Sequence, residues 1–578
     1  MTVCRARVSA LFLSALLLSG ASAAAQGTGQ VLPPVTPFDP ETMERMDPPA
    51  SSVAGPIAVD ALKPPNPEAA GVLDSSQGGF PATLWAGTPA PVARALLPLL
   101  PGAGASATVR GLERRLLLTA APPPEGARET DTPSLVGLRA ERLMAMGDSE
   151  NATKLAKAVP ASATGPLLAR LKAEAALVAG DVAGACADAA RTAGPAVESD
   201  SLKLSVFCHF SAGNMLQGNL GLDLLRERKD PDQAFIAAAE VMAGLPPVPA
   251  DKIQLSMATP LHMAAFSAAR MALPPQSLAA APVAVAQRLA VQAGAPPELR
   301  LAAAERAEAA GVLPIDSLRK LYLDMVFAPD EMATPLTKAD GAGVRARALL
   351  FRAATDQPDP ALKAKFAAKA VELAAAKGEV AAAARVFEAI LWTIKPDPAL
   401  AAPAPALARA MYALDRPEAA AKWLDMARAD PAAKAADALW PLSAVAAAMP
   451  GQPAGTQGFA AWRATLAGLP PEIAARRTGV VLGVLAGLGA KVPEAAWLDT
   501  LALPTGGPKP GLFAMLQAAA LDARLGGTVL AALAAIGDTP LDRLDVLTLS
   551  EAVSALAVVG LGDEARRLAV EALLANGV

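Results

Sequence analysis

The chain has two histidines, and their surroundings decide whether imidazole chemistry is expected. His209 lies in Ser205–Phe210, an apolar stretch typical of a helix, where a histidine usually belongs to a core or an interface. His262 stands at the start of a predicted helix and has no neighbouring residue of a metal-ligating type. A histidine triad or a histidine-rich metal site needs further ligands or partners close by. We therefore expect neither kind of site.

Catalytic and phosphate-binding motifs are also absent from the sequence. It contains no H-E-x-x-H, G-x-S-x-G, G-x-x-x-x-G-K-[ST] or C-x-x-C pattern. Carboxylates are scattered along the predicted polar helix faces, and we interpret the following as solvated or ion-paired across helices: Glu174, Glu240, Glu308, Glu372 and Glu388. We predict no catalytic residue, no cofactor and no metal. A glutamate-based enzyme or accessory acting on peptidoglycan or a polysaccharide stays open as an alternative.

The first residues have the pattern of an export signal. Arg5 and Arg7 precede an apolar stretch, Val8–Leu18, and the small residues Ala21–Ala25 follow it. Cleavage is expected after Ala23 or Ala25, which defines residues 1–25 as a signal peptide. An uncleaved anchor helix is the alternative, but the apolar stretch is short for one. The predicted location is the periplasm or the exterior of the cell.

Residues 26–78 are predicted to be a disordered tether. They are rich in proline, with the pairs Pro33-Pro34, Pro48-Pro49 and Pro64-Pro65, and they lack apolar periodicity. A short recognition segment is the alternative reading of this composition. Order is expected to start near Phe80.

Charge and hydropathy exclude two classes of partner. The formal charge is −4, basic residues do not cluster, and aromatic residues make up only 4% of the chain, so nucleic acid is not an expected partner. The chain is 53% hydrophobic, mostly through alanine. Its best candidate span, Gly479–Ala490, has about 12 residues where about 20 are needed. No membrane span is expected after signal cleavage.

Turns recur at a constant interval in the first half of the chain. Gly147-Asp148, Gly180-Asp181 and Gly213-Asn214 are spaced 33 residues apart, each between two helical stretches. Glycine ends a helix at low cost because it adopts the left-handed conformation, and Asp or Asn then caps the next helix. One such turn in every period of this length predicts a solenoid of helical hairpins.

The hairpins also predict a disulfide between Cys186 and Cys208. Cys4 lies in the signal, so these two are the cysteines that remain after cleavage. They are on neighbouring antiparallel helices, each about 11 residues from the connection near Ala196 and Val197, and so lie at nearly equal height. A Cα separation of roughly 5.5–6 Å is then attainable, and an oxidising compartment favours pairing. Two small buried residues facing different neighbours are the alternative.

Similar hairpins recur around Gly378 and Gly560, and one more is Leu407–Arg428. In that copy Tyr412, Ala413, Ala420 and Trp423 follow the pattern of small residues at a helix crossing with a bulky residue beside them. About half of the chain resembles the tetratricopeptide repeat family in this way, although the family's Trp-Leu-Gly opening is missing. The resemblance implies a right-handed α-solenoid with a concave binding surface.

Two proline-containing segments interrupt this rhythm and carry the same pentapeptide, at Met257–Leu261 and Met332–Leu336. We interpret it as a helix start, with threonine as N-cap and proline in the first turn. Helical repeats are therefore expected over residues 79–250 and 346–578, with an irregular helical segment over 251–345 between them.

The expected fold is all-α, and the expected function is non-enzymatic. We expect a scaffold or adaptor that binds a protein, peptide or envelope polymer through its helical-repeat surface. A purely structural envelope protein is a further alternative.

Overall fold

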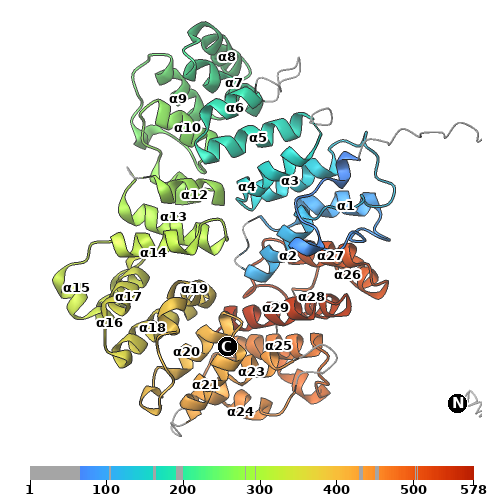
Figure 1. Cartoon of the computed structure of the whole chain (residues 1–578), viewed down its shortest axis with the longest axis vertical. Helices are drawn as coiled ribbons and strands as arrows, with labels where there is room; N and C mark the ends of the chain where they lie inside the picture. The colour runs from blue at the N-terminus through green and yellow to red at the C-terminus, as the bar shows by residue number, and fades with distance from the viewer. Residues whose placement is uncertain are drawn as a thin grey trace, which may run out of the picture. The chain divides into compact units, whose positions relative to one another are not determined.

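The computed structural model describes residues 66–578 except 103, 105, 161–164, 190–198, 280, 293–294, 429–433, 449–454, 502 and 504–505. The predicted signal peptide and the tether as far as residue 65 lie outside the described residues. From residue 66 onward these residues form one compact unit (Figure 1).

The described residues are all-α, as predicted, and contain no β-strand beyond two isolated bridges. The first elements are η1 (Pro67–Ala69), η2 (Ser75–Gln77), α1 (Ala90–Leu96), η3 (Leu97–Leu99) and α2 (Ala107–Leu118). The first hairpins comprise α3 (Leu135–Ala145), α4 (Ser149–Ala158), α5 (Pro166–Ala179), α6 (Val182–Ala189), α7 (Ser199–Ser211), α8 (Met215–Glu227) and α9 (Gln233–Met242).

Shorter elements follow in the middle of the chain. They are η5 (Ala250–Lys252), α10 (Pro260–Ala268), α11 (Pro275–Ala279), α12 (Val283–Val291), α13 (Pro297–Ala309), α14 (Ile315–Asp324), α15 (Pro329–Ala333), α16 (Pro335–Lys338) and η6 (Ala339–Gly341).

The last part consists again of paired helices. It comprises α17 (Arg345–Asp356), α18 (Pro360–Ala375), α19 (Val380–Leu391), η7 (Pro398–Leu400), α20 (Ala404–Ala413), α21 (Pro417–Arg428), α22 (Ala435–Ala438), α23 (Trp440–Ala446), α24 (Phe459–Ala464), α25 (Pro471–Gly487), η8 (Glu494–Thr500), α26 (Pro510–Leu521), α27 (Leu525–Ile536), α28 (Val546–Val558) and α29 (Gly562–Ala575). Among the helices that the structure describes, none has both the length and the apolarity needed to cross a bilayer.

The glycine turns have the predicted backbone conformation. Gly147, Gly180 and Gly213 have φ of +80°, +81° and +78°, values that favour glycine. The carboxylate of Asp148 accepts from the Asn151 amide at 3.3 Å and so caps α4. Asn214 precedes α8 as expected, but its side chain makes no capping hydrogen bond. That part of the prediction is wrong, because position alone does not orient a side chain.

The shared pentapeptide starts two helices but caps only one of them. Thr259 caps α10 and Pro260 follows in its first turn, as predicted. Thr334 precedes α16 without capping it, because its hydroxyl donates to the carbonyl of Asp330, in the preceding helix α15, at 3.2 Å.

Order begins earlier than the predicted boundary at residue 78. Glu68 is buried, and its carboxylate accepts from the Val136 amide at 2.9 Å. The guanidinium of Arg139 donates to the Ala70 carbonyl at 2.7 Å. Residues 66–78 are therefore fastened to α3 by polar contacts, which the proline-rich composition does not reveal.

The first and last helices of the compact unit pack against each other. α1 and α2 contact α27, and α2 also contacts α29 (Figure 1). The Thr108 amide at the start of α2 donates to Glu571 of α29 at 3.0 Å, and Arg115 pairs with Glu564 at 2.7 Å. The larger hydrophobic cluster accordingly includes both Phe80 and Leu573. The predicted division of this unit at residues 250 and 345 does not separate its core.

Candidate functional site

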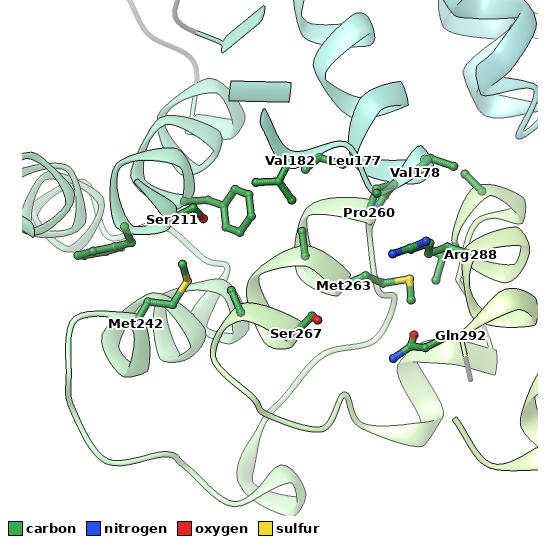
Figure 2. Close-up of a pocket in the computed structure, with 17 residues that line it drawn as sticks. Leu177, Val178, Val182, Ser211, Met242, Pro260, Met263, Ser267, Arg288 and Gln292 are labelled. Carbon is green, nitrogen blue, oxygen red and sulfur yellow. The ribbon is translucent and has the colours of Figure 1, made fainter. Parts of the chain in front are cut away.

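A cavity of about 600 Å³ lies where α5, α7, α9, α10 and α12 meet (Figure 2). We call it the Arg288 cavity. Its lining residues are mostly apolar: Leu177, Val178, Gly180, Val182, Phe207, Phe210, Ser211, Met242, Pro260, Met263, Ala264, Ser267, Ala268, Ala284, Val285, Arg288 and Gln292. A cavity of this size and character is typical of a binding site.

The end of α5 gives the cavity its shape on one side. Gly180 ends this helix in the left-handed conformation, and the chain turns into α6. A Cβ built on Gly180 would lie 2.9 Å from an Nη atom of Arg288. The turn glycine therefore leaves room for the guanidinium to lie against the backbone.

Arg288 is the one charged side chain among the described residues that line this cavity. Figure 2 shows its guanidinium pointing toward Pro260 and Met263, on the same side of the cavity as Gln292. Within the described residues the guanidinium has no hydrogen-bond or ion-pair partner. Arg288 is exposed, and a guanidinium without a partner at the edge of a cavity can receive an anionic group.

A second cavity, of about 340 Å³, shares Leu177, Pro260 and Ala284 with the first. We call it the His262 cavity. Its charged lining residues are Glu141, Arg170, Glu174, Asp200, Lys203 and Asp232. Four carboxylates against two cations make this cavity acidic, in contrast to the Arg288 cavity.

His262 is buried and has a carboxylate partner, so the prediction that it lacks a neighbouring ligand type is wrong. Its Nε2 lies 2.9 Å from Asp232, which is 30 residues away in the sequence. Lys203 also pairs with Asp232, at 3.1 Å. Burial alone would raise the pKa of Asp232, but the hydrogen bond to His262 and the charge of Lys203 are among the contacts that lower it to about 2. No helix periodicity links these residues, since they come from three different helices or turns.

A hydroxyl, an imidazole and a carboxylate thus follow one another in the His262 cavity. The Oγ1 of Thr259 lies 2.8 Å from Nδ1 of His262, and the Thr259 amide donates to the same Nδ1 at 3.2 Å. The His262 amide in turn donates to Thr259 Oγ1 at 3.3 Å. This reciprocal pattern is a capping box, so the start of α10 accounts for the whole arrangement.

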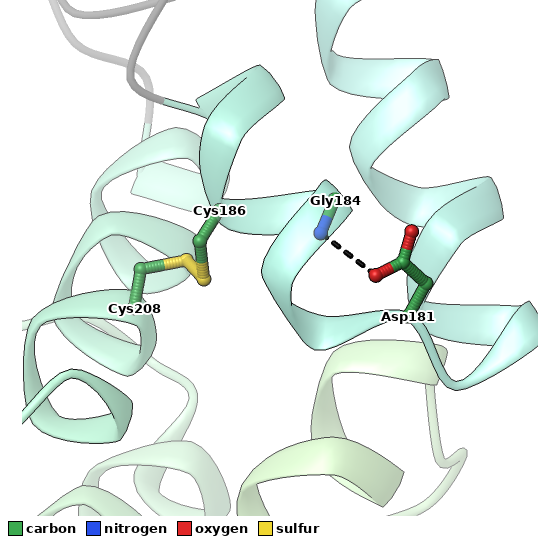
Figure 3. The surroundings of a disulfide bond; sticks show 4 residues. All are labelled: Asp181, Gly184, Cys186 and Cys208. Carbon is green, nitrogen blue, oxygen red and sulfur yellow. Dashed lines mark hydrogen bonds between the residues drawn. A yellow bond between two sulfur atoms is a disulfide. The ribbon is translucent and has the colours of Figure 1, made fainter.

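The disulfide partners lie next to the Arg288 cavity. The sulfurs of Cys186 and Cys208 are 2.02 Å apart and their Cα atoms 5.4 Å apart, which joins α6 to α7 (Figure 3). Asp181 caps α6 in the same view, by accepting from the Gly184 amide at 2.8 Å. Val182 and Phe207, each within four residues of one cysteine, line the cavity.

The glutamates predicted to be ion-paired have different surroundings. Glu308 is buried and pairs with Arg385 at 2.6 Å. Glu174 pairs with Arg170 at 3.3 Å, and burial raises its pKa. Glu174 also lines the His262 cavity, unlike the others. No group of three or more side chains suited to hold a metal ion gathers in the part of the chain that the structure describes.

A third cavity, of about 430 Å³, lies where α2 meets α29. Its charged residues balance: Arg115, Arg385, Glu388, Asp415, Arg416, Glu564, Arg567 and Glu571. Several of them pair with one another, as Arg115 does with Glu564. These contacts hold the first and last helices together.

Comparison with known proteins returned no matching family model, no matching curated protein and no matching solved structure. Arg288 was not predicted from the sequence as a site residue. Its one local signal is an arginine in a mostly apolar helix, with Gln292 directly after the end of that helix.

Proposed function

We propose that this protein is a non-enzymatic scaffold or adaptor of the cell envelope that binds a peptide segment of a partner protein in the Arg288 cavity. The observation that carries this proposal is the cavity itself, which has a volume of about 600 Å³, mostly apolar lining residues and, among the described residues, one unpaired cation. Apolar walls give affinity through burial, and a few polar groups fix orientation.

Two further expectations belong to this proposal. The helix pairs would form a right-handed, tetratricopeptide-like α-solenoid, a class of fold that binds partners on a concave surface. Export through the signal at residues 1–25 would place the protein in the periplasm or outside the cell.

Polar side chains in the cavity favour a peptide as the occupant. Ser211, Ser267 and Gln292 line it, and their side chains have no hydrogen-bond partner within the described residues. Hydroxyl and amide groups both donate and accept, so they can satisfy the backbone of an extended peptide.

Selection from a peptide library tests the proposal. The mature protein is used to select from random octapeptides that display a free C-terminus. Ser267 is exposed and points into the cavity (Figure 2), so Ser267→Trp should occupy the cavity without disturbing the core. We expect the selected peptides to bind the wild-type protein and to lose affinity for Ser267→Trp. Ala518→Trp, at an exposed position on α26, is the control. Equal affinity for all three proteins would contradict the proposal.

A second candidate function rests on Glu174. A half-buried carboxyl with a raised pKa beside a cavity is suited to general acid catalysis. Turnover of peptidoglycan that is lost in Glu174→Gln and kept in Glu240→Gln would establish an enzyme and displace the binding proposal.

A further inference from the structure

We propose that the Arg288 cavity recognises the C-terminal carboxylate of its peptide, with Arg288 as the residue that binds it. This inference rests on the proposed function and specifies which part of a partner protein enters the cavity.

The charges around the two neighbouring cavities determine where an anionic group of the ligand can lie. Among the described residues that line it, the Arg288 cavity has a single formal charge, the guanidinium, at the side formed by α12 (Figure 2). The His262 cavity, beyond Pro260, contains four carboxylates that would repel an anion. An anionic group is therefore favoured beside Arg288 and disfavoured on the other side of Pro260.

The donors at this end suit a carboxylate. A guanidinium presents two parallel N–H groups to the two oxygens of a carboxylate. Gln292 directly follows α12, four residues after Arg288, and lies on the same side of the cavity (Figure 2). Its amide N–H₂ can donate to the same group. Neither side chain has a competing partner within the described residues.

The rest of the lining suits apolar side chains that precede the carboxylate. Met263 lies near Arg288 and Met242 on the other side of the cavity (Figure 2), and Val285, Phe207 and Phe210 also line it. Methionine adapts to apolar groups of different shape, which suits recognition of varied residues. A ligand with one terminal charge and an apolar body matches this distribution. A chain end provides that arrangement without burying a second charge.

A thermodynamic cycle tests the inference. A peptide selected on the wild-type protein is synthesised with a free C-terminus and with a C-terminal amide, and its Kd is measured for wild type and for Arg288→Ala. Amidation and the substitution should each weaken binding by about tenfold or more, since each removes the same charge-assisted contact. The amidated peptide should bind both proteins equally well.

Two controls distinguish this inference from the proposed function. Arg543→Ala removes an exposed arginine far along the chain and should leave both Kd values unchanged. Replacing an internal acidic residue of the peptide by its amide should have little effect. If the amidated peptide binds wild type as tightly as the free acid, the inference about the carboxylate is wrong. Loss of binding in Ser267→Trp would in that case still support peptide binding in the Arg288 cavity.

The other anionic amphiphile with this chemistry is a fatty acid. Titration of the protein with palmitate tests directly whether a fatty acid is the ligand. Palmitate binding that Arg288→Ala abolishes, together with no selected peptide, would overturn the inference in favour of a lipid ligand.

Discussion

At the scale of the residue, Gly180 and Gly213 provide a matched pair. Both end a helix at nearly the same positive φ, but only a Cβ on Gly180 would meet Arg288; nothing lies within 4 Å at Gly213. We predict that Gly180→Ala and Gly213→Ala each cost about 1 kcal/mol of unfolding free energy, from the same backbone strain. Gly180→Ala alone should weaken binding of a selected peptide, because the guanidinium must move. Equal Kd values for the two variants would refute the role given to Gly180.

Glu113 is a buried carboxyl that makes the stability depend on pH. Its side chain is fully buried, and neither oxygen has a hydrogen-bond partner in the described part of the chain. Burial raises its pKa to about 8. Between about 4.5, the value in the unfolded chain, and about 8, folding takes up a proton. The stability that this carboxyl contributes is therefore complete below about pH 4.5 and is lost as the pH rises toward 8.

Replacing this carboxyl should flatten the pH profile. Glu113→Gln cannot ionise, so its unfolding free energy should fall less steeply than that of wild type between pH 5.5 and 7.5. The difference in slope is expected to reach up to about 1.4 kcal/mol per pH unit. Urea unfolding at the two pH values measures it, with the exposed Glu494→Gln as control. Parallel profiles for wild type and Glu113→Gln would show that Glu113 has an ordinary pKa.

Residues that act locally were predictable from the sequence, and residues that act across the fold were not. The glycine at position 180 and the cap at Thr259 follow from signals within a few residues. The contact between His262 and Asp232 spans 30 residues, and it depends on how α9 and α10 pack. Arg288 has functional interest only because distant helices leave it unpaired in a cavity, and no local pattern encodes that.

At the scale of the element, the cysteine pair should fasten α6 to α7. The bond would close a loop of 22 residues, which corresponds to about 3 kcal/mol in the chain-entropy description. Cys186→Ser with Cys208→Ser should lower the unfolding free energy by roughly that amount, and reduced wild type should match the double variant. Thiol labelling of the denatured, unreduced protein checks the bond itself. Two reactive thiols under those conditions would contradict it.

Paired helices were predicted from the interval between turns because each hairpin is encoded locally. The predicted hairpin at Leu407–Arg428 is α20 and α21, where Ala420 and Trp423 are both buried. The folded start at residues 66–78 was missed, because its order comes from Glu68 and Arg139 reaching other parts of the chain.

At the scale of the whole compact unit, contact between α2 and α29 joins the two ends of the helix succession. The carboxylate of Glu571 accepts from the Thr108 amide and from the hydroxyls of Ser106 and Thr108. It lies at the N-terminus of α2, where the helix dipole favours a negative charge. This contact spans more than 460 residues, so no local pattern indicates it.

Removal of the Glu571 carboxylate should destabilise both α2 and α29. Glu571→Ala is expected to cost about 1–3 kcal/mol, because it leaves the N–H and hydroxyl donors of α2 without their acceptor. Amide hydrogen exchange should accelerate in α2 and in α29. Glu418→Ala, at an exposed site on α21, is the control. Faster exchange confined to α29 would show that the two ends are not coupled.

The central claim is that a peptide segment binds where α5, α10 and α12 meet, and hydrogen–deuterium exchange of the full chain with a selected peptide tests it most directly. We predict that saturating peptide slows exchange at the end of α5, along α10 and along α12, and that Ser267→Trp abolishes this protection. Protection elsewhere in the chain that persists in Ser267→Trp, with no change in these three helices, would contradict the claim.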